Sequence, residues 1–173
     1  DKKFKKVEHL NSSQSKLKNL VKLIRPHQWM KNLLVFIPML AGHQFTKNAT
    51  FKSFLAFCAF SMIASGIYIV NDLFDIQSDR QNPEKRKRSI ASGNVLVLRA
   101  ILICFFLLIG GLTIAGLINT NLLLISILYV ISTIVYSIYV KRFIIIDICF
   151  LSMFYTLRLL AGSEASEVTL SFW

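Results

Sequence analysis

The amino-acid sequence predicts an all-helical membrane protein whose helices cross the bilayer several times. Of its 173 residues, 54% are hydrophobic and only 17% are charged, and the mean hydropathy is +0.57. Soluble domains are usually less apolar and more highly charged. The apolar residues also come in long unbroken runs, which are typical of helices that span a membrane.

Five apolar runs are expected to span the membrane. They lie at residues 33–45, 54–70, 95–117, 122–140 and 143–162. The first is shorter than the roughly 20 residues that a span needs, so we expect its helix to begin nearer Trp29 and to kink at Pro38. A polar loop is predicted at residues 43–52, and the basic connection at residues 80–94 is expected to form a structured cap.

The two ends of the chain also carry expectations. Residues 1–19 are rich in lysine and polar, and the sequence does not begin with methionine. We expect them to form a cytoplasmic basic tail or a linker from an upstream segment, with residues 20–173 as the N-terminal portion of a membrane domain.

The distribution of charge predicts how the protein lies in the membrane. The formal net charge is +11, but nine basic residues precede Leu33 and six lie between Arg80 and Arg99. Clusters beside membrane spans indicate orientation and attraction to anionic lipid, so nucleic-acid binding is not expected. With a cytoplasmic N-terminus, seventeen basic residues outside the spans lie on the cytoplasmic side and two, Lys47 and Lys52, on the other. We therefore expect a multi-pass protein of a bacterial plasma membrane.

Three aspartates at the end of the second span give the strongest functional signal. Asp72, Asp75 and Asp79 fall within an arc of roughly 60° on one helical face, at about 100° per residue. Crowded carboxylates repel one another unless a cation lies among them, and oxygen ligands suit Mg²⁺, which completes its shell with water and substrate phosphates. The spacing favours a magnesium site for a diphosphate. The alternative is that these are solvated charges just beyond a membrane helix.

Basic residues that follow the aspartates fit the same anion. Lys85, Arg86 and Arg88 lie in the connection after the second span. They would neutralise phosphate oxygens that the metal does not reach, and arginine offers a bidentate fork for them.

Polar residues beside the first span allow two interpretations. Pro26 suits the first turn of a helix and Trp29 suits the membrane interface, so this segment could be an interfacial anchor. Gln28, Lys31 and Asn32 could equally point into a polar cavity, and we treat them as candidate substrate-binding residues.

Ionisable residues inside and beside the last two spans are further candidates. Asp147 and Arg158 lie eleven residues apart, close to three helical turns, and charges within a bilayer usually face a protein interior or a watery cavity. About 16 Å of helical rise separates them, so each needs another partner, and a purely structural role is the alternative. Tyr139 is either an interface anchor or part of the site, and Lys141 could contact a phosphate.

The acidic motif resembles the first aspartate-rich motif of the UbiA superfamily of intramembrane prenyltransferases. The resemblance rests on Asn-Asp-x-x-Asp-x-x-x-Asp, which begins at Asn71, and on the basic loop after it. Arg-Pro-x-Gln-Trp-x-Lys-Asn at residues 25–32 and Lys-Arg-x-Arg-x-Ile-Ala-Ser-Gly at residues 85–93 look most like the decaprenyl-phosphate phosphoribosyltransferase branch. The resemblance covers roughly residues 20–163.

This resemblance implies nine membrane helices around a central cavity, of which the chain supplies about five. It also implies that Mg²⁺ on Asp72, Asp75 and Asp79 bridges a diphosphate, with Asn71 among the residues that contact substrate. Many relatives have a second pair of acids four residues apart, whereas here Asp147 is followed by Leu151. That difference favours phosphoribosyl transfer over prenyl transfer to an aromatic acceptor.

The expected activity of the intact protein is transfer of 5-phosphoribose from its diphosphate to a polyprenyl phosphate. The alternatives are prenyl transfer from a prenyl diphosphate to an aromatic acceptor and, in another class, a non-catalytic membrane or transport module. The expected partners are a polyprenyl lipid, a small molecule that carries a diphosphate, and the membrane. Residues 1–173 alone are expected to be inactive.

Overall fold

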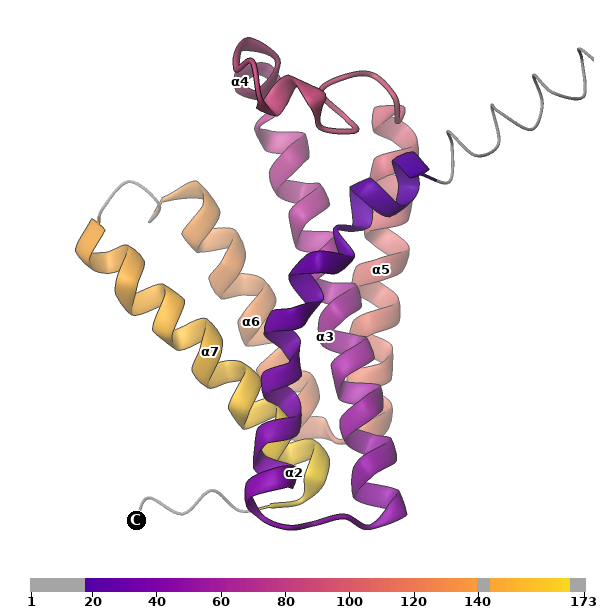
Figure 1. The fold of residues 1–173 in the computed structure, drawn as a ribbon, viewed down its shortest axis with the longest axis vertical. Helices are drawn as coiled ribbons and strands as arrows, with labels where there is room; N and C mark the ends of the chain where they lie inside the picture. The colour runs from indigo at the N-terminus through magenta and orange to yellow at the C-terminus, as the bar shows by residue number, and fades with distance from the viewer. Residues whose placement is uncertain (1–17, 140–143, 169–173) are drawn as a thin grey trace, which may run out of the picture.

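Helices form every regular element in the part of the protein that the computed structural model describes, residues 18–139 and 144–168. In order, the elements are a helix at residues 18–24, the 3-10 helix η1 (Pro26–Phe36), α2 (Ile37–Ala41), α3 (Lys47–Phe74), α4 (Ile76–Gln81), the 3-10 helix η2 (Lys85–Lys87), α5 (Val97–Ile118), α6 (Thr120–Ile138) and α7 (Ile144–Ser166). Figure 1 shows the long helices as an elongated bundle with α4 at one end. The predicted all-helical class is confirmed.

Four helices, α3, α5, α6 and α7, are long and apolar enough to cross a membrane. They correspond to four of the predicted spans, and the largest error is at the start of α3, which begins at Lys47 instead of Phe54. Thr46 explains the difference, because its Oγ1 accepts a hydrogen bond from the N–H of Ala49 at 3.2 Å and so caps the helix. The polar loop predicted at residues 43–52 is correspondingly shorter.

The first predicted span is built differently from the others. It begins at Pro26, earlier than expected, because proline fits the first turn of a helix, and it consists of the 11-residue η1 followed by the five-residue α2. A 3-10 helix rises about 2.0 Å per residue and an α-helix about 1.5 Å, so the two segments extend over about 30 Å, the thickness of a hydrocarbon core. The type of helix changes beside Pro38, where a kink is predicted.

The core lies where η1, α3, α6 and α7 meet. Figure 1 shows α3 alongside α5, with α6 and α7 on the other side and η1 running between α3 and α7. The ring of Tyr129 packs against Phe60 of α3 and Phe154 of α7, at centroid distances of 5.4 and 5.8 Å. The same cluster includes the buried Val35 of η1. These contacts fix four helices around one interior.

The connection from α3 to α5 is folded back over the end of the bundle. Ile90 and Val95 are buried there together with Leu23, from the helix at residues 18–24. Arg80 Nε also donates to the carbonyl oxygen of Ala91 at 3.3 Å. A structured connection, as the sequence predicts, therefore covers this end of the bundle.

Candidate functional site

Two buried aspartates share one guanidinium group at the end of α3. The Nη1 of Arg88 lies 3.1 Å from Oδ1 of Asp72 and 2.8 Å from Oδ2 of Asp79. Asp72 is 4% exposed and Asp79 is 1% exposed, whereas Arg88 is only partly buried. Buried carboxylates are stable only when they are paired and hydrogen-bonded, so this arrangement depends on the cation.

Arg25 provides a second cation for Asp72. Its Nη2 lies 2.6 Å from Oδ1 and 2.8 Å from Oδ2 of that carboxylate, and its guanidinium group lies 5.3 Å from the centre of the Tyr68 ring. Its backbone is left-handed, with φ 54° and ψ 60°, a conformation that is uncommon outside glycine and is often found at functional sites. Asp72 is thus held between two arginines, Arg25 from before α3 and Arg88 from after it.

Asp75 occupies a different place from the other two aspartates. It is half-buried at the junction where α3 ends and α4 begins, with φ −91° and ψ 8°. The predicted single helical face is therefore interrupted between Asp72 and Asp79. Among the described residues, no three Asp, Glu, His or Cys side chains are grouped closely enough to hold a metal ion as they stand.

An opening beside Asp72 has more cations than acidic groups in its lining. It encloses about 210 Å³ between Lys22, Arg25, His27, Asp72, Arg88 and Ser89. Lysine and arginine outnumber the acidic group three to one in this lining, so the opening attracts anions. The arrangement can bind phosphate oxygens next to two buried carboxylates.

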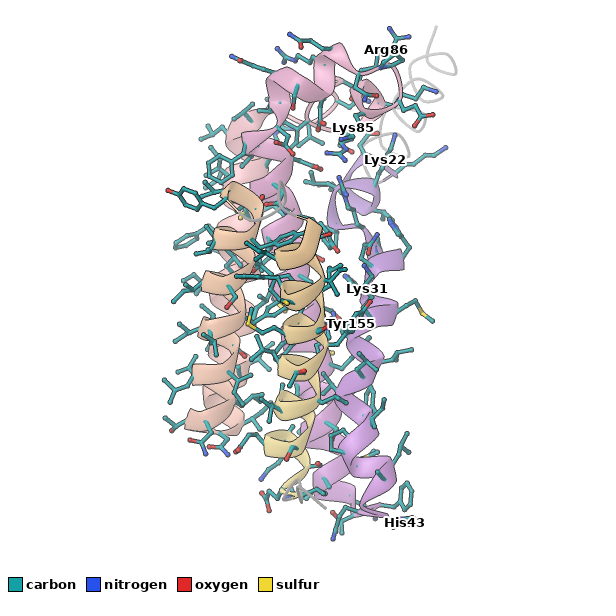
Figure 2. All side chains as sticks on the ribbon, turned by 90° about the vertical axis from the view of Figure 1, so that its left-hand side faces the viewer. Lys22, Lys31, His43, Lys85, Arg86 and Tyr155 are labelled. Atoms are coloured by element: carbon teal, nitrogen blue, oxygen red, sulfur yellow. The ribbon has the colours of Figure 1, made fainter. Side chains whose placement is uncertain are left out.

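The other predicted basic residues of the connection lie farther out. Lys85 and Arg86 belong to η2 and are exposed, and Figure 2 shows them with Lys22 at the same end of the molecule. Of the three predicted phosphate contacts, only Arg88 touches the aspartates. Lys85 and Arg86 stand at the rim of this end.

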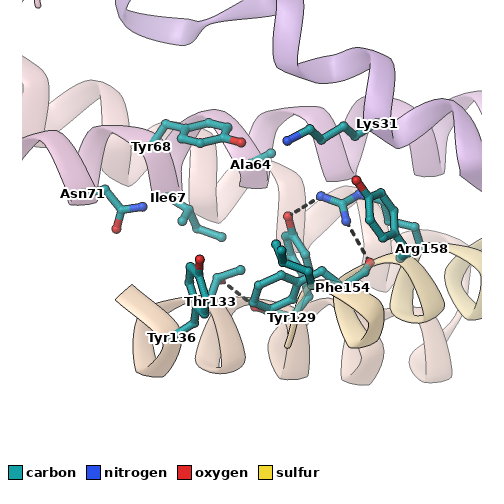
Figure 3. Close-up of a pocket in the computed structure, with 12 residues that line it drawn as sticks. Lys31, Ala64, Ile67, Tyr68, Asn71, Tyr129, Thr133, Tyr136, Phe154 and Arg158 are labelled. Carbon is teal, nitrogen blue, oxygen red and sulfur yellow. Dashed lines mark hydrogen bonds between the residues drawn. The ribbon is translucent and has the colours of Figure 1, made fainter. Parts of the chain in front are cut away.

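A second cavity, of about 240 Å³, lies inside the bundle. Figure 3 shows its lining, which comes from four elements: Lys31 of η1; Ala64, Ile67, Tyr68 and Asn71 of α3; Tyr129, Thr133 and Tyr136 of α6; and Leu151, Phe154, Tyr155 and Arg158 of α7. Asn71 at one end of the cavity directly precedes Asp72 in the chain. The cavity and the cationic opening are therefore both lined by residues of the last turn of α3.

Arg158 is a buried charged group at the other end of this cavity. It is 6% exposed and donates from Nε to Oδ1 of Asn32 at 2.9 Å, from Nη1 to the carbonyl oxygen of Phe154 at 2.8 Å, and from Nη2 to the hydroxyl of Tyr129 at 2.7 Å. The amide nitrogen of Asn32 donates in turn to Ser61 Oγ at 3.1 Å. This network joins η1, α3, α6 and α7 around one guanidinium group.

The remaining candidates are more dispersed. Asp147 accepts a 2.6 Å hydrogen bond from the hydroxyl of Tyr136, a residue of the cavity wall. The Gln28 side-chain oxygen accepts one from Tyr68 at 3.3 Å. Tyr139, at the end of α6, is 69% exposed, and Lys141 lies outside the described residues.

Comparison with known proteins gives this site a family context. Residues 34–173 match the UbiA prenyltransferase family. The chain belongs to this family. Its members are transferases, and the four apolar helices agree with an integral membrane protein.

Individual proteins are similar to this chain over most of its length. The decaprenyl-phosphate phosphoribosyltransferase of Mycobacterium tuberculosis is 35% identical over 160 residues, which cover 89% of this chain and 53% of that protein. Nodulation protein NoeC of Azorhizobium caulinodans is 36% identical over 144 residues, which cover 83% of this chain and 47% of that protein.

A solved structure from work on digeranylgeranylglyceryl phosphate synthase in membranes has a similar fold. Its TM-score with this chain is 0.77 and the identity is 26%, and the match covers 87% of this chain and 53% of the solved chain. The chain thus spans about half the length of each of these relatives.

Sequence reasoning missed several members of this candidate site. Arg25 and Lys22 were not among the candidates although they line the cationic opening, and Tyr68 and Tyr129 were missed in the inner cavity. An arginine directly before Pro26 was the available signal for Arg25. The two tyrosines lie inside apolar runs and carry no comparable signal.

Proposed function

We propose that the intact protein transfers 5-phosphoribose from phosphoribosyl diphosphate to a polyprenyl phosphate at the cytoplasmic side of a membrane. An oxygen of the lipid phosphate forms a bond to C1 of ribose, and the bond from C1 to the diphosphate oxygen breaks. Diphosphate leaves with the bonding electron pair. The similarity to decaprenyl-phosphate phosphoribosyltransferases supports this substrate pair.

The observation that carries the proposal is the pair of buried carboxylates on one guanidinium group. Two carboxylates that already share a cationic partner, Asp72 and Asp79 on Arg88, are a donor set that fits a hard cation such as Mg²⁺, and Asp75 is a third oxygen donor in the same motif. When bound, the metal supplies positive charge for the departing diphosphate. Arg88 would then exchange the carboxylates for phosphate oxygens.

The residues around the opening have the complementary task of binding the diphosphate. Lys22, Arg25 and Arg88 line the opening beside Asp72, and charge-assisted hydrogen bonds from such groups stabilise phosphate oxygens as negative charge develops on them. Lys85 and Arg86, at the rim of this end, would attract the anion before it binds.

Transfer of label from the donor to a lipid tests the proposal directly. Membranes that contain the intact protein are supplied with labelled phosphoribosyl diphosphate, with and without polyprenyl phosphate and with and without Mg²⁺. We expect a labelled product that extracts into organic solvent only when polyprenyl phosphate and Mg²⁺ are both present. If no such product forms while the protein is folded, this assignment is wrong.

Prenyl transfer to an aromatic acceptor is the second candidate. The structural likeness to a digeranylgeranylglyceryl phosphate synthase favours the transfer of a prenyl group, although the name of that enzyme indicates a glyceryl phosphate acceptor and not an aromatic one. Prenyl transfer would use the same acidic motif to hold a prenyl diphosphate. A labelled prenyl diphosphate, offered separately with an aromatic acceptor, distinguishes the two reactions. A non-catalytic or transport role predicts no Mg²⁺-dependent release of diphosphate from either donor.

A further inference from the structure

The charge of Arg158 is balanced by no acidic group in the described part of the protein. Its three hydrogen bonds go to an amide oxygen, a backbone carbonyl and a phenol, and no carboxylate of the described residues lies within 4.0 Å of it. A guanidinium group has five N–H donors. Two of them therefore have no acceptor among residues 18–139 and 144–168.

A buried charge with only neutral partners is unfavourable in a low-dielectric interior. Arg158 is 6% exposed and lies in the wall of the 240 Å³ cavity. An anion that enters the cavity would compensate this charge and accept hydrogen bonds from the two remaining N–H groups. The arrangement thus has the properties of a preformed anion subsite.

Lys31 strengthens the same end of the cavity. Figure 3 shows its side chain and Arg158 near one another, with Asn71 at the far end. In the described part of the chain Lys31 has neither a hydrogen bond nor an ion pair within the protein, and it is exposed. It can therefore turn toward a ligand without giving up another partner.

The distance between the two ends separates this subsite from the acidic motif. The wall of α3 runs from Ala64 to Asn71, which is about 10 Å along the helix. One diphosphate bound beside Asp72 and Asp79 would not also contact Arg158. The cavity thus offers two anion positions joined by an uncharged stretch that includes Tyr68 and Thr133.

We propose that Arg158 and Lys31 bind a phosphate monoester at the inner end of this cavity, separate from the diphosphate at the aspartate motif. This inference rests on the proposed function, whose two substrates each carry such a group: the lipid phosphate of the acceptor and the 5-phosphate of the ribosyl donor. Both offer three acceptor oxygens, which match the guanidinium fork and the ammonium group.

Binding of monoester probes to the intact, detergent-solubilised protein tests the subsite without turnover. Farnesyl phosphate and ribose 5-phosphate are titrated separately in the absence of Mg²⁺, by calorimetry and by the shift of the thermal unfolding midpoint, with farnesol as the probe that lacks phosphate. We expect one phosphate probe to bind. Binding of farnesyl phosphate assigns the subsite to the acceptor lipid, and binding of ribose 5-phosphate assigns it to the donor.

Two substitutions connect that binding to the proposed residues. Arg158→Gln is expected to raise the dissociation constant of the bound probe by at least about tenfold and Lys31→Gln by about three- to tenfold, as the loss of charge-assisted hydrogen bonds predicts. Arg158→Lys should restore part of the affinity. Lys47→Gln, at the opposite end of α3, should bind like the unaltered protein.

The outcomes separate this proposal from the proposed function. If Arg158→Gln does not fold, binding of the probe to Lys31→Gln tests the subsite, because Lys31 is exposed. Asp79→Asn should lose transfer activity and still bind the monoester probe. If monoester binding is absent while transfer still depends on Asp79, the subsite proposal fails and the proposed function stands. The proposal is overturned if neither phosphate probe binds, if farnesol binds equally well, or if Lys31→Gln and every folded Arg158 variant bind like the unaltered protein.

Discussion

Arg88 joins two carboxylates that would otherwise repel each other inside the protein. The 2.8 and 3.1 Å contacts to Asp79 and Asp72 compensate charges that are almost fully removed from water. Arg25 adds a second cation on Asp72. A site that holds two acids through cations is prepared for ligands that exchange these partners, and this is what a diphosphate with a metal ion would do.

Neutralising one of these acids should abolish transfer. In the intact protein, Asp79→Asn is expected to lower kcat by at least about 100-fold, because it removes a carboxylate that would hold Mg²⁺ beside the departing diphosphate. Asp75→Ala is likewise expected to lower activity, by well over a factor of two. Steady-state rates with phosphoribosyl diphosphate and polyprenyl phosphate provide the measurement.

The control for this prediction is another acid of the same connection. Glu84 is exposed at the start of η2, and Glu84→Gln should keep the activity of the unaltered protein. If Asp79→Asn and Glu84→Gln retain the same activity, the aspartate motif has no role in the reaction.

At the scale of the elements, α7 and η1 approach each other closely at Gly162, which has the shortest Cβ contact of the glycines. A Cβ atom built on Gly162 would lie 2.1 Å from the carbonyl oxygen of Val35, so only glycine lets the two backbones touch. Such contacts hold membrane helices together because lipid competes poorly with close packing of small residues. This contact fixes α7, and with it Arg158, against η1.

Adding a methyl group at this contact should loosen the bundle. Gly162→Ala is expected to lower the free energy of unfolding by about 1–3 kcal/mol, since the clash is with backbone that cannot rotate away. The matched control is Gly116→Ala in α5, whose added Cβ would lie 3.5 Å from its nearest neighbour, a side-chain carbon of Leu123. Thermal unfolding in detergent compares the two, and equal stability of both variants would contradict the packing argument.

At the scale of the whole molecule, positive charge and the acidic motif lie at one end. Lys22, Lys85 and Arg86 gather there, and His43 lies at the other end (Figure 2). This asymmetry predicts that the end with the aspartates faces the cytoplasm. The direction matters because phosphoribosyl diphosphate would be delivered from that side.

Cysteine labelling tests the orientation. Gln77→Cys lies in α4 and Asn48→Cys at the start of α3, and both positions are exposed. A membrane-impermeant maleimide should label Asn48→Cys in intact cells and Gln77→Cys only in inside-out vesicles. The unaltered protein controls for the natural cysteines, Cys58, Cys104 and Cys149, which lie within spans. Reversed labelling would overturn the orientation.

The size of the described bundle predicts how it behaves alone. The chain spans about half the length of the similar proteins named above, and its inner cavity is lined by polar groups such as Asn71 and Thr133. Polar groups that face lipid are unfavourable, so a polypeptide that ends at Trp173 should show no turnover in the label-transfer assay. Turnover comparable to that of the full-length protein would show that residues 1–173 suffice.

The sequence by itself determined the helical class, four of the five spans and the family, and it pointed to the aspartates and to Arg88. These features are local, because hydropathy is averaged over about one span and motifs are read along the chain. The predicted starts of helices differ from the structure where a cap or the type of helix decides them, as at Thr46 and Pro26.

Only the tertiary structure decided which side chains meet. Arg25 reaches Asp72 across 47 positions of the sequence, and Arg158 reaches Asn32 across 126. Such pairs depend on how helices pack and on backbone turns such as the left-handed Arg25, neither of which is encoded in a local pattern. The two proposed anion positions follow only from the placement of η1, α3, α6 and α7 around one cavity.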